Sequence, residues 1–456
     1  MTVSPAVAAH LPEWAEIVAH LRAPGRTRVV DVLRAADLAG SPAVQPRCGV
    51  AGHADMLELL RALAAARPSI LSVTIDSHTR LRQFDTAAQL LARDPTQLNG
   101  YPLIAHGWQR ARELTSAVTV PLEVRHGSPD GRDLFAVALA AGISSFEGGG
   151  IGYNLPYCKN VPLSESLRAW QEIDSLCGEL AAAGVIVDRE FFGTLTAVLV
   201  PPAISIAVTL LEALAAVRAG VRCVSLAYPQ GGELHQDVAA LRCLRRLAAR
   251  YLGPQVEAYP VLHEFMGVFP RHPQWATALI LYGGLLARLG GATKVVNKTE
   301  HEAHGVPDAD ANARGIVTTA VGASALFDFV RVDEDRIAEE VHWIEREVVE
   351  LVEPVLAGDD LLTGIAGAFH DGRLDVPFTA SVHARGDVLP RRDRTGAIRF
   401  ARTGALPLSA ATRRRNTELL GRVGDERELS LLDAVTRDIY YFADRDAELD
   451  LVTETP

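Results

Sequence analysis

Short runs of β-type residues alternate with longer amphipathic segments through most of this chain, and this alternation constrains the fold more than any other feature. Nine such runs can be recognised, at residues 43–47, 70–76, 101–105, 120–125, 143–147, 185–190, 222–228, 257–263 and 293–298. Strands that alternate with helices predict a parallel sheet covered by helices. About eight such units over roughly 250 residues predict an α/β fold of the TIM type, a (β/α)8 barrel.

One of the nine runs must lie outside an eight-stranded barrel, and we expect it to be the first, residues 43–47. A doubly wound open sheet is the competing fold. It is disfavoured because no Gly-x-Gly-x-x-Gly motif follows the first strand and no Walker-type lysine loop occurs in the sequence.

The segments on either side of the alternating region have different patterns. Apolar residues recur at helical spacing within residues 1–40, which predicts an N-terminal helical extension. Near the other end, residues 337–352 form a charged amphipathic pattern, and residues 386–402 are loop-rich and basic. We therefore divide the chain into the extension at 1–40, the barrel at 41–330 and a C-terminal α+β lobe at 331–456.

The charge and the cysteine content exclude several classes of partner. The 56 acidic and 45 basic residues give a net charge of −11, and without a basic tract we expect no nucleic acid partner. Five cysteines without Cys-x-x-Cys spacing indicate neither a disulfide framework nor a zinc site, and they suit a reducing cytoplasm. We see no signal peptide pattern, and the most apolar run, 276–287, is too short to span a bilayer, so we expect no membrane partner.

Nearly every predicted strand ends in charged or hydrogen-bonding residues. These are Arg47, Asp76 with Arg80, Asn99, Arg125 with His126, Glu147, Arg189 with Glu190, His263 with Glu264, and Lys298. The carboxyl ends of barrel strands are where active sites assemble. The repetition across the units therefore predicts one convergent site, although any single polar strand end is ordinary.

The stretch from Phe146 to Tyr157, Phe-Glu-Gly-Gly-Gly-Ile-Gly-Tyr-Asn-Leu-Pro-Tyr, is the most distinctive of these strand exits. Three consecutive glycines allow the backbone to approach a ligand closely, next to the carboxylate of Glu147 and two phenols. A small-molecule site is one interpretation, and a flexible glycine turn after a strand is the other.

Three arginines follow predicted strands, at positions 47, 80 and 125. Guanidinium groups bind carboxylates through two parallel hydrogen bonds. Three arginines facing Glu147 would suit a ligand with two carboxylates and one ammonium group, which is an acidic amino acid. The alternative is three separate salt bridges that tie loops to the barrel rim.

Several longer stretches closely resemble the large (epsilon) subunit of glutamate mutase, also called methylaspartate mutase. They are Gln45-Pro-Arg-Cys-Gly-Val50, Val73-Thr-Ile-Asp-Ser-His-Thr-Arg80, Leu98-Asn-Gly100, Arg125-His-Gly-Ser-Pro-Asp130, Glu147 through Val161, Leu199-Val-Pro-Pro202, Ala239-Ala-Leu-Arg-Cys-Leu244, Gly291 through Glu302, Leu374-Asp-Val-Pro-Phe378 and Pro390-Arg-Arg-Asp393. They occur in the family's order and cover nearly the whole chain.

The resemblance implies an adenosylcobalamin-dependent radical rearrangement that interconverts L-glutamate and threo-3-methyl-L-aspartate. In this family a separate small (sigma) subunit carries the Asp-x-His-x-x-Gly motif that supplies the cobalt ligand. Here Asp76-Ser-His78 imitates only the first half of that motif, because Leu81 replaces the glycine. The resemblance therefore implies a small-subunit partner, a homodimer of this chain within a heterotetramer, and no metal ligands of its own.

The resemblance also assigns roles to individual residues. Glu147 would be the catalytic residue and would take the substrate's amino group. The substrate would be bound by Arg47, Arg80, Arg125, His126, Glu147, Tyr153 and Tyr157. The cofactor would be contacted by Gly49, Asn99, Pro156, Phe269, Lys298, Glu302 and Val306, with Thr74, Phe192 and Lys294 in the same wall. From the residues alone, an ion-pair cluster of Lys294, Lys298 and Glu302 at the rim remains the alternative.

Positions 78, 191, 194 and 297 depart from the family pattern, and the first three leave the length of the substrate side chain open. Two other function classes also remain open. One is a cobalamin-independent lyase or isomerase that uses Glu147 or His126 as an ordinary acid–base group. The other is a non-catalytic assembly subunit.

Overall fold

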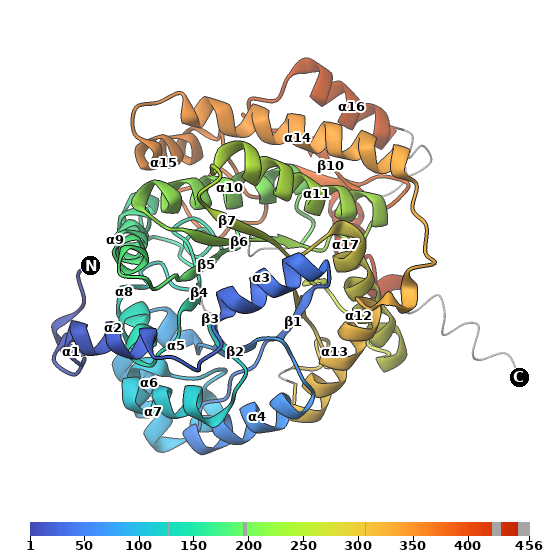
Figure 1. Cartoon of the computed structure of the whole chain (residues 1–456). Helices are drawn as coiled ribbons and strands as arrows, with labels where there is room; N and C mark the ends of the chain where they lie inside the picture. Colours follow the sequence, from blue (N-terminus) through green and yellow to red (C-terminus); the bar gives the residue numbers. More distant parts are fainter. Residues whose placement is uncertain (126, 195–197, 306, 422–429, 446–456) are drawn as a thin grey trace, which may run out of the picture.

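Eight parallel strands form a barrel in this computed structural model, which describes residues 1–125, 127–194, 198–305, 307–421 and 430–445 (Figure 1). The strands are β1 (Ala43–Pro46), β2 (Leu71–Thr74), β3 (Leu122–Arg125), β4 (Ser145–Glu147), β5 (Asp188–Phe191), β6 (Cys223–Pro229), β7 (Glu257–His263) and β8 (Lys294–Asn297). Their hydrogen-bonded order is β1-β8-β7-β6-β5-β4-β3-β2. The ring closes between β1 and β2, where the Thr74 amide donates to the Cys48 carbonyl at 2.8 Å. The predicted TIM-type barrel is confirmed.

Helices follow the strands and surround the barrel (Figure 1). They are α4 (His53–Ala65), α5 (Ser77–Arg80), α6 (Phe84–Arg93), η1 (Pro95–Gln97), α7 (Leu103–Ala117), α8 (Arg132–Ala140), α9 (Leu163–Ala182), α10 (Pro202–Ala219), α11 (Leu234–Tyr251), α12 (Pro273–Gly290), α13 (Ala309–Gly322) and η2 (Ala325–Phe327). Their apolar faces and the outward faces of the strands form one continuous core.

The expectation that residues 43–47 lie outside the barrel is wrong. They contain β1, whose register pairs Ala43 with Lys294 of β8. The run outside the barrel is 101–105, of which only Tyr101 forms an isolated bridge, with Ile75, before α7 begins at Leu103. Pro102 explains the difference, because proline has no amide hydrogen and is tolerated at the start of a helix.

Three N-terminal helices, α1 (Pro5–Ala8), α2 (Trp14–Arg22) and α3 (Val29–Ala39), precede the barrel. Val29, Val30 and Leu33 of α3 pack against Ala43, Ile70, Cys223 and Tyr259. These four partners lie at or near the amino ends of barrel strands, so α3 closes that end of the barrel. The carboxyl ends of the strands remain available for a site.

The C-terminal elements cover one side of the barrel. They are α14 (Glu334–Leu356), α15 (Leu361–Asp371), β9 (Leu389–Arg392), β10 (Ile398–Arg402), α16 (Ala410–Gly421) and α17 (Leu431–Ile439). Helix α14 packs across α10 and α11 (Figure 1). The basic stretch that we expected to be loop-rich contains an antiparallel hairpin of β9 and β10.

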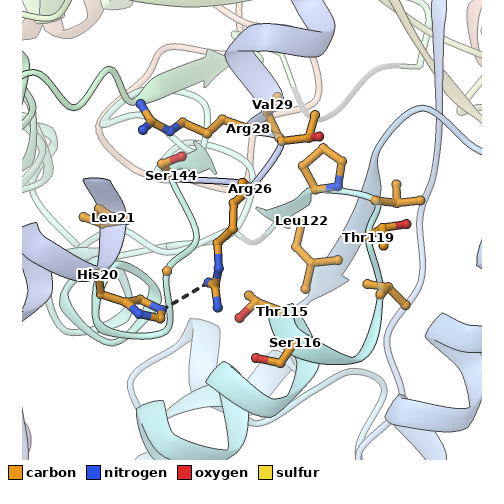
Figure 2. Close-up of a pocket in the computed structure, with 16 residues that line it drawn as sticks. His20, Leu21, Arg26, Arg28, Val29, Thr115, Ser116, Thr119, Leu122 and Ser144 are labelled. Carbon is orange, nitrogen blue, oxygen red and sulfur yellow. Dashed lines mark hydrogen bonds between the residues drawn. The ribbon is translucent and has the colours of Figure 1, made fainter. Parts of the chain in front are cut away.

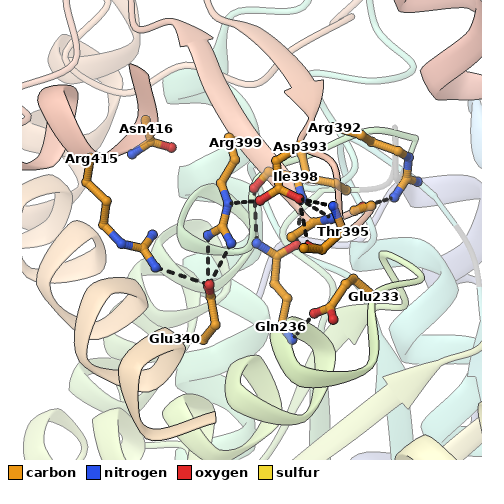
Figure 3. A network of polar contacts seen from close by, with 12 residues as sticks. Glu233, Gln236, Glu340, Arg392, Asp393, Thr395, Ile398, Arg399, Arg415 and Asn416 are labelled. Atoms are coloured by element: carbon orange, nitrogen blue, oxygen red, sulfur yellow. Dashed lines mark hydrogen bonds and ion pairs between the residues drawn. The ribbon is translucent and has the colours of Figure 1, made fainter. Parts of the chain in front are cut away.

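Buried polar contacts attach this hairpin to the helices beneath it (Figure 3). Arg399 of β10 donates to both carboxylate oxygens of Glu340 on α14, at 2.8 and 2.5 Å. Gln236 of α11 pairs with the backbone of Ile398 in both directions, at 3.0 and 2.8 Å. Because these groups are buried, breaking one contact would leave its partner unsatisfied. The network therefore fixes the hairpin on the barrel.

One helix, α10, is long and apolar enough to cross a membrane by length and composition alone, and 78% of its apolar window is buried inside the protein.

The division of the chain at residues 40 and 330 stays a proposal. It agrees with the positions of the elements, since β1 begins at Ala43 and α14 at Glu334.

Candidate active site

A cavity at the carboxyl ends of the strands gathers most of the residues that the sequence assigns to the substrate. Its empty volume is about 380 Å³, and its lining consists of Arg47, Thr74, Arg80, Arg125, Gly127, Glu147, Tyr153, Tyr157, His263 and Met266. Six of the seven predicted substrate residues are therefore together. The seventh, His126, lies outside the described residues.

Arg125 is surrounded by carboxylates from its own strand β3 and from β4 and β5. Its Nη1 donates to Glu123 at 2.7 Å, and its Nη2 donates to Glu147 at 2.8 Å and to Glu190 at 3.1 Å. Burial opposes the charge of Arg125, but the three carboxylates outweigh burial and raise its pKa. Its Nε is buried and has no hydrogen-bond partner in the described part of the chain, so one donor of this guanidinium is left for a ligand.

The pKa of the Glu147 carboxyl group lies near physiological pH, so that its protonated and its ionised form are both populated. Burial raises its pKa to about 7, the neighbouring charges of Glu190 and Glu123 act in the same direction, and Arg125 and a hydrogen bond with Tyr153 oppose them. A buried carboxyl group of this kind becomes more acidic when a cation approaches. Glu147 is therefore suited to accept an ammonium group from a ligand.

Arg47 and Arg80 are partly exposed, and within the described ranges neither forms an ion pair with a carboxylate. The Arg80 guanidinium lies 5.9 Å from the centre of the Tyr157 ring. Three separate rim salt bridges were the alternative interpretation of the arginines. Arg47 and Arg80 form no such salt bridge within the described ranges. The carboxylate partners of Arg125 lie inside the barrel and not at its rim.

His263 and Met266 also line the cavity, although the sequence did not assign them to the substrate. The His263 ring stacks on Phe192 with centroids 4.2 Å apart, and its Nε2 lies 2.9 Å from Glu190. Burial lowers the pKa of His263 to about 3, so the ring is neutral at physiological pH. His263 could have been found from its position at the end of a strand, whereas no feature of the local sequence indicates a role for Met266 in the cavity.

Glu147, Glu190 and His263 are close enough to hold a metal ion, with ligand atoms within 4.8 Å of one another. Nη2 of Arg125 already lies 2.8–3.1 Å from all three side chains. A metal ion would have to displace this guanidinium or bear its repulsion.

Below the cavity, the barrel interior is ionic where most barrels of this type are aliphatic. Nζ of Lys294 lies 2.6 Å from Glu123 and 2.5 Å from Glu190, and all three side chains are fully buried. Ser145 bridges Glu123 and Asp188. These carboxylates hold Lys294 in the centre of the barrel, where it lines neither of the two cavities of the site, and its assignment to the cofactor wall stays a prediction.

A second cavity adjoins the first and shares Arg47 and Thr74 with it. Its empty volume is about 790 Å³, and its other lining residues are Cys48, Gly49, Val50, Leu59, Asn99, Glu302, Gly305, Pro307 and Asn312. Lys298 pairs with Glu302 at 2.7 Å, as the ion-pair interpretation expected, but without Lys294. The hydroxyl of Thr74, a residue that lines both cavities, is buried and has no hydrogen-bond partner among the described residues.

The second cavity contains three of the residues predicted to contact the cofactor, namely Gly49, Asn99 and Glu302. Pro156 and Phe269 are not part of its lining; Pro156 is half-buried after β4, and Phe269 is buried in an apolar cluster. Val306 lies outside the described residues. The polar side chains of this cavity and the buried Thr74 hydroxyl fit the hydroxyl groups of a nucleoside sugar.

The consecutive glycines after β4 are required by packing against neighbouring helices, and their role toward a ligand stays a prediction. Gly148 has a φ of +151°, and a Cβ there would lie 2.1 Å from Trp170 of α9. A Cβ on Gly149 would lie 2.2 Å from Glu212 of α10, which accepts the amide of Ile151 at 2.7 Å. The first two glycines therefore pack closely against α9 and α10, while Tyr153 and Tyr157 of the same loop line the cavity.

Arg189 of β5 supports Glu147 from behind. Its guanidinium donates to the carbonyls of Phe146 and Gly148, at 2.7 and 2.8 Å, and to Asp174 of α9 at 2.8 Å. These carbonyls flank Glu147 on both sides. The pair Arg189–Asp174 thus fixes the backbone that directs Glu147 into the cavity.

The positions that depart from the family pattern lie away from both cavities. Phe191 packs 5.0 Å from the Arg189 guanidinium, Thr194 contacts Ser205 at 2.6 Å, and His78 contacts Gln83 at 2.8 Å. Asn297 is buried and donates to the Lys298 carbonyl. None of the four lines the substrate cavity.

A third cavity, at the opposite end of the barrel, contains none of the predicted site residues (Figure 2). Arg26 and His20 face it, 3.1 Å apart, and both lie over Gly142 just after the end of α8. A cation in this position stabilises the carbonyl end of a helix. The contact with the helix end therefore accounts for the position of Arg26, and no ligand is needed to explain it.

Comparison with known proteins agrees with this geometry. A family model described as "Methylaspartate mutase E chain" matches residues 23–446. The chain is 42% identical to the glutamate mutase epsilon subunit of Halobacterium salinarum over 92% of this chain and 89% of the relative. The epsilon subunits of Haloarcula marismortui (42% identity, 84% and 80% coverage) and Desulfitobacterium hafniense (40% identity, 87% and 84% coverage) are similar to it as well. The chain therefore belongs to the methylaspartate mutase E chain family.

Proposed function

We propose that this chain is the large catalytic subunit of a mutase that interconverts L-glutamate and threo-3-methyl-L-aspartate. The observation that carries the proposal is the cavity in which Arg47, Arg80 and Arg125 face Glu147. The guanidinium groups of Arg47 and Arg80, which have no carboxylate partner among the described residues, match the two carboxylates of either compound. The free Nε of Arg125 adds a third donor, and Glu147 matches the ammonium group.

In this proposal the chain's own residues bind and orient the substrate. Arg47 and Arg80 hold the two carboxylates, and the paired Arg125 contributes its remaining donor. Glu147 accepts the ammonium group while Tyr153 donates to its carboxylate. Tyr157 completes the wall, and His126 remains a proposed contact by family resemblance. Holding both carboxylates keeps the two parts of a rearranging carbon skeleton within reach of each other.

The adjoining cavity is the proposed place for the adenosyl part of adenosylcobalamin, which supplies the radical chemistry when bound. Gly49, Asn99, Lys298 and Glu302 would hold it, with Thr74 offering its unsatisfied hydroxyl. Pro156, Phe269 and Val306 remain proposed contacts by family resemblance. Phe192 belongs to the substrate side in this arrangement, because it stacks on His263.

A small (sigma) subunit would supply the cobalt ligand, and a homodimer of this chain within a heterotetramer remains part of the proposal, as does a location in the cytoplasm. The partial motif in this chain is engaged elsewhere. Asp76 caps α5 by accepting the amides of His78 and Thr79, both at 3.0 Å. These contacts support the view that Asp76 and His78 are not a cobalt site.

A cobalamin-independent lyase or isomerase is the second candidate, because a carboxyl group with a pKa of about 7 also suits a general base. One anaerobic assay separates the two. L-glutamate is incubated with the chain, a candidate small subunit and adenosylcobalamin, and the products are followed with each component omitted in turn. We expect methylaspartate only in the complete mixture. Turnover of the amino acid without cobalamin would favour the lyase or isomerase.

The three arginines offer a second test of the substrate. Lysine keeps the charge but cannot form two parallel hydrogen bonds. Each of Arg47→Lys, Arg80→Lys and Arg125→Lys should raise the KM for glutamate, and a double variant should deviate from additivity because the residues share one ligand. Arg168→Lys, exposed on α9, is the matched control. Additive losses of thermal stability with an unchanged KM would contradict the shared-ligand proposal.

A further inference from the structure

The loop between β7 and α12, residues 264–272, has two sides with different surroundings. Met266 lines the substrate cavity. Phe265 and Phe269 are buried in an apolar cluster together with residues of α12, among them Ala276 and Ile280. The position of the cavity wall at Met266 therefore depends on how the two phenylalanines are held.

A residue near the far end of the chain completes this cluster. The ring of Phe442 lies 4.8 Å from that of Phe265 in a nearly perpendicular arrangement of 80°, the geometry that aromatic pairs prefer. Phe442 also covers Gly232 in the loop after β6, where a Cβ would lie 2.8 Å from the ring. It therefore packs between the loops that follow β6 and β7.

Several contacts hold the segment of Phe442 in place. Asp438 of α17 accepts the amide of Arg392 at 3.0 Å and also pairs with Arg391. The Arg392 guanidinium donates to the Asp438 carbonyl at 3.0 Å and lies 4.1 Å from the Tyr441 ring. Arg392 belongs to the hairpin that Gln236 attaches to the barrel helix α11 and Glu340 attaches to α14 (Figure 3).

We propose that Phe442 is a positioning residue, through which the C-terminal segment 430–445 holds the β7–α12 loop and so sets the Met266 wall of the substrate cavity. The contacts run without a break from the barrel helices to the hairpin, α17, Phe442, Phe265 and the cavity wall. This inference has two parts. The mechanical part, that Phe442 holds the β7–α12 loop in place, rests on the contacts alone. The functional part, that the position of the loop affects substrate binding, rests on the proposed function.

Hydrogen exchange of the peptide that covers residues 264–270 tests the mechanical part. Phe442→Ala removes the aromatic pair, and exchange there should become about 2- to 10-fold faster. Phe442→Leu keeps apolar packing and should restore most of the protection. Tyr440→Ala is the matched control, because this neighbouring aromatic side chain is 44% exposed and should leave exchange in the loop unchanged.

The KM for glutamate tests the functional part in the complete enzyme. We expect Phe442→Ala to raise KM by a similar factor while kcat changes by less than about twofold, and Phe442→Leu to restore KM. Unchanged exchange in Phe442→Ala, an equal change in Tyr440→Ala, or faster exchange with an unchanged KM would each overturn the proposal. A wild-type enzyme that does not turn over glutamate would refute the proposed function instead, and exchange alone would then decide the positioning role.

Discussion

Glu147 is contacted by one cation in the structure and is proposed to meet a second one in the substrate. Its partner Arg125 is shared with Glu123 and Glu190, so the four side chains carry more negative than positive charge when all are ionised. Lys294 offsets part of this excess from below. An arriving ammonium group would offset more, which gives the site a preference for ligands that carry one.

The variant Glu147→Gln keeps the shape of the side chain and removes its charge. A hydrogen bond to a charged group contributes about 1.5–3 kcal/mol. We therefore expect kcat/KM for glutamate to fall on the order of 10- to 100-fold, while cofactor binding changes little. Glu58→Gln, exposed on α4, is the control. Wild-type kinetics for Glu147→Gln would place the substrate's amino group elsewhere.

The raised pKa of Glu147 predicts how substrate affinity depends on pH. Only the ionised carboxylate attracts an ammonium group, and protonation competes with the substrate as the pH falls through about 7. Between pH 8 and pH 6, the dissociation constant of glutamate should therefore rise about tenfold. Calorimetric titrations at several pH values would measure it. The dependence should disappear in Glu147→Gln, and its persistence there would assign it to another group.

At the residue scale, the sequence was sufficient to find the site but not its contacts. Arg47, Arg125, Glu147 and His263 are recognisable because each one ends a strand, and parallel strands bring their carboxyl ends together. The partners of Arg125 come from β3, β4 and β5, and no local pattern shows which of them it would choose. Met266 could not be found, because an apolar loop residue has no chemical signature.

At the scale of elements, the exit of β4 is the most constrained part of the barrel. Gly148 fits against Trp170, and Arg189 satisfies the carbonyls on both sides of Glu147. The sequence shows the glycines, but both a ligand and a helix can require them. The structure shows that packing against α9 and α10 requires Gly148 and Gly149, and a requirement by a ligand stays a prediction.

The variant Gly148→Ala tests this constraint. The added Cβ would lie 2.1 Å from Trp170, on a backbone whose φ of +151° disfavours a side chain. We expect a loss of about 1–3 kcal/mol in the free energy of unfolding, measured with denaturant. Gly367→Ala is the control: it lies inside α15 with open space around its Cβ and should be neutral or stabilising by roughly 0.5–1 kcal/mol. Equal stability of the two variants would contradict the packing role.

Element boundaries were harder to predict than element types. The run 101–105 has the composition of a strand, yet Pro102 interrupts its pairing and α7 begins there. Residues 43–47 were expected to lie outside the barrel, whereas β1 needs only the four residues Ala43–Pro46 to close the ring. Short strands are fixed by their neighbours and not by their own propensity.

At the scale of the whole molecule, this chain supplies all eight strands of the barrel. The proposed reaction nevertheless needs a second protein, which would supply the cobalt ligand. Among the described residues, Asp76 and His78 are bound to α5 and Gln83. We therefore expect the isolated chain to bind cobalamin weakly and to be inactive until a small subunit is added. Spectroscopic titration with cobalamin, with and without that subunit, would measure this. Tight cobalamin binding by the isolated chain would contradict the proposal that the small subunit supplies the cobalt ligand.

The ionic interior of the barrel also limits how proteins with this site can diverge. Loss of Lys294 would leave Glu123 and Glu190 buried without one of their cations, and loss of Glu123 would affect both Lys294 and Arg125. Removing one partner of a buried ion pair is far more damaging than replacing the whole pair. Single substitutions at these positions should therefore be eliminated by selection. Related sequences that have changed one of them are expected to have changed a second one with it, so that charge balance inside the barrel is inherited as a unit.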